Sequence, residues 1–219
     1  EKMVDGVIYM SSSLEEETLD IINELDLKTV LVETKDKEGR LPSVYIDNIE
    51  ATYEATKHLL DKGIKNIAFI GVDKSSANAW GDRYIGYEKA LNEAGITVDE
   101  DLVYFEGLKV KSGYVASEKF LASGKNFDGI ICASDEIAMG AINGLREKGV
   151  NTPEDVSVIG FNDNVVASYF YPKLTTVKQP SYDMGSVAMR MLIKILNNKP
   201  LEKAEFILKH ELIERESCK

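Results

Sequence analysis

Short apolar runs alternate with longer amphipathic stretches along the whole chain. Apolar runs of this length, bounded by glycine or polar residues, are typical of buried strands. The stretches between them repeat apolar residues every three or four positions, as helices do. Strands that alternate with helices predict a mostly parallel sheet covered on both faces, an α/β fold. The expected strands are Val7–Met10, Thr29–Val32, Ser43–Ile46, Ile67–Ile70, Leu102–Phe105, Ile130–Ala133, Val156–Ile159, Phe206–Leu208 and Glu211–Ile213, whereas Leu174–Val177 is expected to cross the surface.

The chain is organised around the stretch Ile130 to Asp163. Its first strand is followed by Ser134 and Asp135, which are suited to capping a helix. That helix is expected to stop at Gly149, since glycine takes a left-handed cap without steric cost. The next strand ends in the loop Gly160–Asp163. In open α/β sheets such loops, at the carboxyl ends of strands, line the ligand crevice.

An internal repeat predicts two similar lobes. Val4–Tyr9 (VDGVIY) matches Phe127–Cys132 (FDGIIC), and each is followed by a serine-capped helix in our prediction. The second copy is preceded by two further strand–helix units between Ile64 and Lys125. By this comparison about 60 residues of the first lobe lie upstream of Glu1. We therefore expect a fragment of a longer protein, and poor solubility for a chain that truly starts at Glu1, because an apolar sheet face would be exposed.

Composition narrows the function classes. The net charge is −11 and the pI about 4.8, so a broad nucleic-acid-binding face on this stretch is not expected. The sequence has no run of 18 apolar residues, so no membrane span is expected. The two cysteines suggest no disulfide framework and fit the cytoplasm. His58 and His210 make no motif, and no metal-ligand spacing is present.

No enzyme signature is visible, so we expect no catalytic residues and no cofactor. A binding crevice for a small molecule is predicted from the loops that follow the strands. Arg83 could clamp hydroxyls or a phosphate there, or be a solvated residue at a helix start. Trp80, on an expected polar loop, could stack on a sugar ring or cap the lobe edge. Ser134, Asp135 and Asn162 are capping and turn residues that could also contact a ligand.

The predicted helix Ser181–Leu196 has two faces. Its core stripe consists of Met184, Ala188, Met191, Leu192 and Ile195. Asp183, Val187, Arg190 and Lys194 share the other face by their spacing. A basic pair beside a valine on an acidic protein is a candidate docking spot for an anionic partner, and an ordinary solvated face is the alternative.

Four segments resemble the effector-binding core of LacI/GalR-type transcription regulators. They are VYIDNIEATYEATKHLLDKGIKNIAFIG, RYIGYEKALNEAGI, ASDEIAMGAINGLREKGVNTPEDVSVIGFND and PKLTTVKQPSYDMGSVAMRMLIKIL. The resemblance covers nearly the whole chain and implies a fold similar to periplasmic sugar-binding proteins. Such proteins have two Rossmann-like lobes with parallel sheets, three crossovers and ligand between the lobes. The crossovers would lie near Tyr45, Thr176 and Leu201, giving a truncated first lobe of residues 1–45 and 177–200 and a second lobe of residues 46–176 and 201–219.

Within the family, the chain is similar to the catabolite control protein A type. The phrase YD-x-G-x-x-(A/S)-M-R-x-L-x-K is matched from Tyr182 to Lys194. The resemblance implies that this helix, with an arginine near the C-terminus, binds the serine-phosphorylated phosphocarrier protein HPr. The residues predicted for that site are Tyr182, Asp183, Val187, Arg190, Lys194 and Arg215.

The resemblance also implies a homodimer that binds operator DNA through an N-terminal helix-turn-helix that is not in this chain. Arg83 matches the family's sugar-binding arginine, and Ser134 falls at a common polar contact. Asn162 departs from the usual aspartate, because an amide loses the charge and gains a donor. This departure therefore favours a phosphorylated or different ligand over a plain sugar.

We expect the sensing and dimerisation core of a cytoplasmic LacI-type regulator of carbon catabolite control. Ligand or partner binding would favour one angle between the lobes and thereby set the spacing of the DNA-binding heads. One alternative is a solute-binding protein of a sugar transporter, which an upstream signal peptide would support. An enzyme of doubly wound fold is the third hypothesis, and turnover in a substrate screen would support it.

Overall fold

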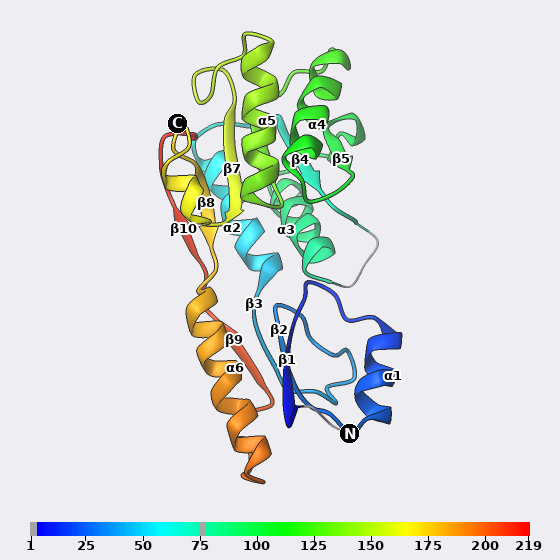
Figure 1. Cartoon of the computed structure of the whole chain (residues 1–219). Coiled ribbons are helices and arrows are strands. Elements are labelled where there is room, and N and C mark those ends of the chain that lie inside the picture. Colours follow the sequence, from blue (N-terminus) through cyan, green and yellow to red (C-terminus); the bar gives the residue numbers. More distant parts are fainter. Residues whose placement is uncertain (1–3, 75–77) are drawn as a thin grey trace. The chain divides into compact units, whose positions relative to one another are not determined.

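A computed structural model describes residues 4–74 and 78–219 as two compact units (Figure 1). Unit 1 comprises residues 4–47, 78–79 and 180–209, and unit 2 comprises residues 48–74, 80–179 and 210–219. The chain changes unit after Asp47 and after Gln179, close to the expected Tyr45 and Thr176. The change expected near Leu201 lies instead after Lys209, because the strand Glu205–Leu208 pairs with Ser43–Ile46 of unit 1.

Unit 1 is built on a four-stranded sheet in the order β1-β2-β3-β9, and all its pairings are parallel. Helix α1 (Glu16–Glu24) joins β1 to β2. Helix α6 (Ser181–Leu196) packs on β1, β2 and β3 and buries Met184, Ala188, Met191 and Leu192, as the apolar stripe predicts. The strands are β1 (Gly6–Met10), β2 (Lys28–Val32), β3 (Ser43–Ile46) and β9 (Glu205–Leu208).

Unit 2 has a six-stranded sheet in the order β10-β8-β7-β6-β4-β5. Only the pairing of β10 with β8 is antiparallel, so the expectation of a mostly parallel sheet is confirmed. The central strands are fully buried. The strands are β4 (Ile67–Gly71), β5 (Val103–Phe105), β6 (Gly129–Cys132), β7 (Ser157–Asn162), β8 (Thr175–Lys178) and β10 (Glu211–Ile213).

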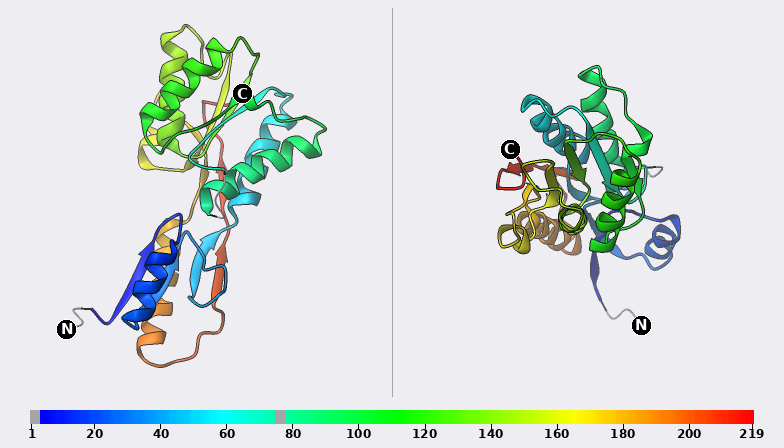
Figure 2. Two further views of the ribbon diagram at one scale, coloured as in Figure 1. Left: turned by 90° about the vertical axis from the view of Figure 1, so that its right-hand side faces the viewer. Right: turned by 90° about the horizontal axis from the view of Figure 1, so that it is seen from above.

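Two pairs of helices cover the faces of this sheet. Figure 2 shows the sheet between the pair α2 (Asn48–Asp61) and α3 (Ala79–Glu93) and the pair α4 (Val110–Ala122) and α5 (Asp135–Glu147). Two 3-10 turns, η1 (Glu100–Leu102) and η2 (Val165–Ser168), precede β5 and β8. Phe69 of β4 lies against Tyr84 and Tyr87 of α3, with ring centroids 5.4 and 5.1 Å apart, so aromatic rings fill the core on this side.

Helix α3 begins earlier than the sequence pattern indicated. It starts at Ala79, so Trp80 lies in its first turn, and the prediction that Trp80 sits on a polar loop was wrong. The spacing of Trp80, Tyr84 and Tyr87 by four and three residues explains the longer helix, because all three then share one face.

The internal repeat corresponds to a repeated strand pairing. Gly6 of β1 stands opposite Lys28 of β2, and Gly129 of β6 stands opposite Ser157 of β7. The helix caps differ between the copies. In α5 the Ser134 hydroxyl accepts from the N–H of Ile137 at 3.3 Å, whereas the N-cap of α1 is Glu15, which makes no side-chain cap. The predicted serine cap is therefore confirmed only in unit 2.

Helices α4 and α5 touch backbone to backbone. A Cβ added at Gly113 would overlap the carbonyl of Ile137, and one added at Gly140 would overlap the carbonyl of Val110. A Cβ added at Gly144 would lie 2.1 Å from the hydroxyl oxygen of Ser117. Protein interiors are packed too densely to absorb an extra carbon against backbone atoms. Glycine at these positions therefore fixes the separation of the two helices.

Replacing Gly140 with alanine should destabilise unit 2 by about 1–3 kcal/mol, the usual cost of overpacking a core. Chemical denaturation followed by circular dichroism measures the change. Gly185→Ala in α6 is the matched control, because nothing lies within 4 Å of its added Cβ. The control should be neutral or stabilising by up to about 1 kcal/mol, since alanine is the better helix former. Equal effects of the two substitutions would contradict a role for close helix packing.

Candidate functional site

The structure brings three of the predicted ligand residues to one cavity of unit 2. Trp80 follows β4, Ser134 follows β6 and Asn162 ends β7, so all three lie at the carboxyl edge of the sheet. There they border a cavity of about 600 Å³. Its full lining is Trp80, Leu108, Lys109, Val110, Lys111, Ser134, Glu136 and Asn162. The cavity is therefore where the topology of an open α/β sheet places a ligand.

Lys109 and Lys111 are lining residues that sequence reasoning missed. Both are exposed at the start of α4, and within the described ranges neither has an ion-pair partner. Lys109 is the N-cap of α4, and its side chain accepts no hydrogen bond from the first N–H groups of the helix. Cations are unfavourable at a helix N-terminus, where the macrodipole is positive. A basic pair at that position was the available signal, and it makes the cavity attractive to an anion.

Arg83 lies inside unit 2, with 2% of its surface exposed. Its Nε donates to Asn48 Oδ1 at 2.9 Å and its Nη1 donates to the carbonyl of Ala133 at 2.6 Å. The guanidinium also lies 3.7 Å from the ring centroid of Phe161 and 4.6 Å from that of Trp80. Arg83 thus fastens α2 to the end of β6 and supports the Trp80 ring. Its role as a clamp on a ligand stays a prediction.

Asp135 is fully buried, and its carboxylate faces the turn after β7. The hydroxyl of Thr176 donates to Oδ1 at 2.6 Å, and the N–H of Asn164 donates to Oδ2 at 2.7 Å. Burial raises the pKa of the carboxyl to about 6, and the two hydrogen bonds only partly oppose that rise. Asp135 is not among the lining residues of the cavity, so its predicted ligand contact stays a prediction.

The turn from Asn162 to Asn164 forms one rim of the cavity. Asn162 and Asp163 have positive φ angles of 111° and 56°, in the region that asparagine and aspartate enter more readily than other non-glycine residues. Asn162 Oδ1 accepts from Gln179 Nε2 at 2.7 Å. Asp163 Oδ1 lies 2.6 Å from Arg215 Nη2. The amide predicted to contact a ligand is therefore oriented by a neighbouring strand end.

The residues predicted to bind a phosphoprotein divide between the units. On α6, Tyr182 is 86% exposed, Asp183 and Arg190 are exposed, and Val187 and Lys194 are half-buried. Lys194 Nζ lies 3.0 Å from Glu202 Oε1, whereas no ion-pair partner of Arg190 is found in the described part of the chain. Arg215 belongs to unit 2, where its Nη1 donates to the carbonyl of Leu174 at 2.8 Å and its Nη2 meets Asp163. Five of the six residues thus share one helix.

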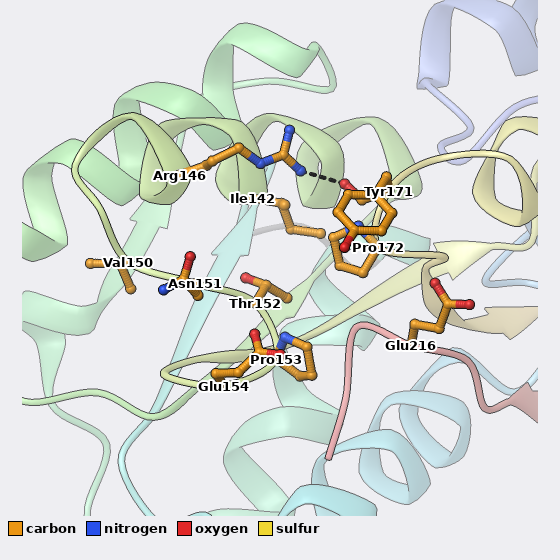
Figure 3. A pocket seen from close by; sticks show the side chains of 10 residues that line it. All are labelled: Ile142, Arg146, Val150, Asn151, Thr152, Pro153, Glu154, Tyr171, Pro172 and Glu216. Atoms are coloured by element: carbon orange, nitrogen blue, oxygen red, sulfur yellow. Dashed lines mark hydrogen bonds between the residues drawn. The ribbon is translucent and has the colours of Figure 1, made fainter.

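A second cavity, of about 820 Å³, lies around the end of α5 and the loop before β7 (Figure 3). Arg146 donates across it to the carbonyl of Tyr171, and Glu154 and Glu216 also line it. The Thr152 hydroxyl is buried and has no hydrogen-bond partner among the described residues. None of the residues predicted from sequence lines this cavity.

Residues 4–74 and 78–219 contain neither a candidate metal site nor a membrane-spanning helix. No group of three or more His, Cys, Asp or Glu side chains in these ranges could hold a metal ion. None of the helices there has the length and hydropathy needed to cross a bilayer. Cys132 and Cys218 are free, and burial raises the pKa of both thiols, which makes them weak nucleophiles.

Comparison with known proteins gives consistent matches. The family model described as periplasmic binding protein-like domain matches residues 56–218. The HTH-type transcriptional regulator RegA of Clostridium saccharobutylicum is 66% identical over 217 residues, which cover 99% of this chain and 65% of that protein. The crystal structure of the transcription regulator CcpA of Lactococcus lactis superposes with a TM-score of 0.91 at 37% identity, covering 99% of this chain and 79% of that one.

A LacI-type transcription regulator from Bifidobacterium animalis subsp. lactis is also similar in structure. Its TM-score is 0.89 at 29% identity, and the match covers 100% of this chain and 80% of that one. The chain spans about two thirds of the length of the curated regulators that it matches. The share is 65% for the RegA of C. saccharobutylicum and 66% for that of C. acetobutylicum.

The raised pKa of Asp135 should make stability depend on pH. Its folded pKa of about 6 lies above the ordinary value of 3.8, so ionisation is harder in the folded state. The stabilisation from this group is fully present below about pH 4 and is lost as pH rises through 6. The shift of about two units corresponds to about 3 kcal/mol. Urea titrations of the wild type and of Asp135→Asn between pH 4 and 8 measure it.

The wild type should gain stability relative to the variant as pH falls through this window, because the asparagine does not titrate. Parallel pH profiles of the two proteins would contradict the assignment of this titration to Asp135.

Proposed function

Since the chain belongs to the LacI family of transcription regulators and carries their periplasmic binding protein-like core, we propose that it senses ligands for carbon catabolite control. Unit 2 binds a small-molecule effector in the cavity beside Trp80. Helix α6 of unit 1 binds a phosphorylated protein partner. The whole protein acts in the cytoplasm as a homodimer that binds operator DNA through a helix-turn-helix outside this chain.

The chemistry of the cavity supports an effector of sugar phosphate type. Trp80 offers a ring face on which a pyranose can stack. Ser134 and Asn162 offer hydrogen-bonding groups for hydroxyls, and Lys109 and Lys111 supply positive charge without an acidic partner in the described ranges. A neutral sugar would use the first three residues and leave the two lysines unused. The lysine pair is the observation that favours a phosphorylated ligand.

The double variant Lys109→Ala/Lys111→Ala tests the effector. Its affinity for glucose 6-phosphate should fall at least about tenfold, because each charge-assisted hydrogen bond is worth about 1.5–3 kcal/mol. Trp80 is the only tryptophan, so its fluorescence reports binding directly. Glucose affinity should change less than about twofold, since a neutral sugar has no phosphate for the two lysines to bind.

The control is Lys65→Ala/Lys209→Ala, which removes the same charge at exposed sites away from the cavity. If this control lost as much affinity as the cavity variant, the effect would come from net charge. If the cavity variant bound glucose 6-phosphate as tightly as the wild type, the proposed anion site would be wrong.

The exposed face of α6 supports docking of serine-phosphorylated HPr. It presents Tyr182 almost fully to solvent, with Arg190 two turns further along the helix. Lys194 is already paired with Glu202 by an ion pair that solvent screens. Arg190 is therefore the stronger candidate for the phosphate contact, because its planar guanidinium can bind two phosphate oxygens at once.

Replacing Arg190 and Lys194 with alanine should weaken binding of serine-phosphorylated HPr at least about tenfold, as expected for loss of charge-assisted contacts. Isothermal titration calorimetry with phosphorylated and unphosphorylated HPr measures the difference. The unphosphorylated protein should bind weakly to the wild type and to the variant alike. Lys65→Ala/Lys209→Ala again serves as the control for charge. Unchanged affinity for the phosphorylated form would overturn the docking assignment.

Exposed apolar side chains near η2 support the homodimer. Val165, Tyr169 and Tyr171 are 80%, 83% and 78% exposed, and all three lie in unit 2. Aromatic residues gathered on a surface are typical of protein–protein interfaces. A second copy of the chain is the partner that this surface would meet in a two-fold symmetric dimer.

A further inference from the structure

We propose that Asp135 is a positioning residue of the effector cavity: its buried carboxylate holds the turn Asn162–Asn164 in the conformation that places the Asn162 amide at the rim. This inference rests on the proposed effector site. It assigns Asp135 an indirect role, in which the residue controls ligand binding without touching the ligand.

The carboxylate is connected to the turn through each of its oxygens. Oδ2 accepts directly from the N–H of Asn164 at 2.7 Å. Oδ1 accepts from the hydroxyl of Thr176 at 2.6 Å, and the same hydroxyl oxygen accepts from the N–H of Asp163 at 3.4 Å. One side chain from the start of α5 therefore restrains two successive N–H groups of the turn, one of them through Thr176.

The turn needs such restraint because its backbone is in an uncommon conformation. Asn162 and Asp163 both have positive φ, which costs free energy in non-glycine residues and persists only when surrounding contacts enforce it. The position of the carboxylate is also tightly defined. A Cβ on Gly160 of β7 would lie 2.5 Å from Asp135 Oδ1, so the carboxylate packs directly against the strand.

Two lining residues of the cavity depend on this turn. Asn162 is part of it, and Glu136 accepts from Asn164 Nδ2 at 2.9 Å. A change in the conformation of the turn would therefore shift both the Asn162 amide and the Glu136 carboxylate that line the cavity. On the other side, Asp163 is held by Arg215 at 2.6 Å, so the turn is fixed between a buried carboxylate and a guanidinium.

The charged and titratable groups around the Asp135 carboxylate influence the pH at which it ionises. Glu136 on α5 and Asp163 in the turn are acidic neighbours, and the Cys132 thiol ends β6. Thr176 on β8 is neutral, and Arg215 after β10 reaches the carboxylate only through Asp163. With a pKa of about 6, Asp135 is ionised at neutral pH and accepts both bonds. Protonation converts one carboxylate oxygen from an acceptor to a donor, so the contacts that hold the turn should change as pH passes through 6.

Hydrogen–deuterium exchange of the folded protein tests the positioning role without any ligand. Asp135→Ala should raise the exchange rates of the Asp163 and Asn164 amides at least about tenfold, because protection reports local opening of hydrogen-bonded backbone. Asp135→Asn can still accept one bond and donate another, so its rates should stay within about threefold of the wild type.

Asp155→Ala is the matched control, because Asp155 Oδ2 accepts from the N–H of Asn151 at 2.7 Å in the loop before β7. It should raise exchange at Asn151 and leave Asp163 and Asn164 unchanged. If Asp135→Ala left the turn protected, or raised exchange equally throughout unit 2, the positioning role would be wrong.

Two functional readouts complete the test. Trp80 emission of the wild type should titrate with a midpoint near pH 6, and Asp135→Asn should abolish that transition. Glucose 6-phosphate should bind Asp135→Ala at least about tenfold more weakly than the wild type, since a mobile rim adds an ordering cost on binding. A wild type that bound no sugar or sugar phosphate would count against the proposed effector site, while the exchange rates would still decide the role of Asp135 at the turn.

Discussion

The close contact between α4 and α5 is the constraint on which the candidate site depends. Gly113 and Gly140 let the two backbones approach until no side-chain carbon fits between them. The separation of the helices therefore leaves almost no freedom at their N-terminal ends, where Lys109, Lys111 and Ser134 border the cavity. Gly86 of α3 approaches the carbonyl of Ile49 in α2 in the same way. Both helix layers of unit 2 are thus set by backbone contact, which tolerates less variation than side-chain packing.

Two buried charged residues hold the strand ends beside the cavity of unit 2 in place. Arg83 and Asp135 follow neighbouring strands, β4 and β6, and are 2% and 0% exposed. A buried charge is costly unless hydrogen bonds satisfy it. Arg83 meets this requirement with Asn48 and the Ala133 carbonyl, and Asp135 with Thr176 and Asn164. Each of these bonds joins segments that are far apart in sequence. The two charged residues therefore hold the ends of separate strands together at one edge of the sheet.

Periodicity was sufficient to predict the parallel sheet and the order of strands and helices except β8, whose residues were expected only to cross the surface, because these follow from local apolar spacing. It also located three lining residues of the cavity, Trp80, Ser134 and Asn162, from their place after strands. It did not predict Lys109 and Lys111, because the unusual basic pair at the start of a helix gains its meaning only from the cavity beside it. The burial of Arg83 and Asp135 was missed for a similar reason. Their hydrogen-bond partners lie 29 to 50 residues away, where no local pattern links them.

The distribution of charge is compatible with the anion binding proposed for such an acidic protein. At a net charge of −11 the long-range field repels any phosphate, so a binding site must rely on short-range contacts. Most lysines with described contacts are paired with carboxylates, as in Lys125 with Asp99 and Lys148 with Glu118. Among the basic residues without such a partner in the described ranges, Lys109, Lys111 and Arg190 lie where a ligand or partner is proposed. Salt screens the long-range repulsion over about 8–10 Å but weakens contacts at hydrogen-bond distance far less. Moderate ionic strength should therefore impair anion binding here less than it would on a basic protein, where the long-range field is attractive.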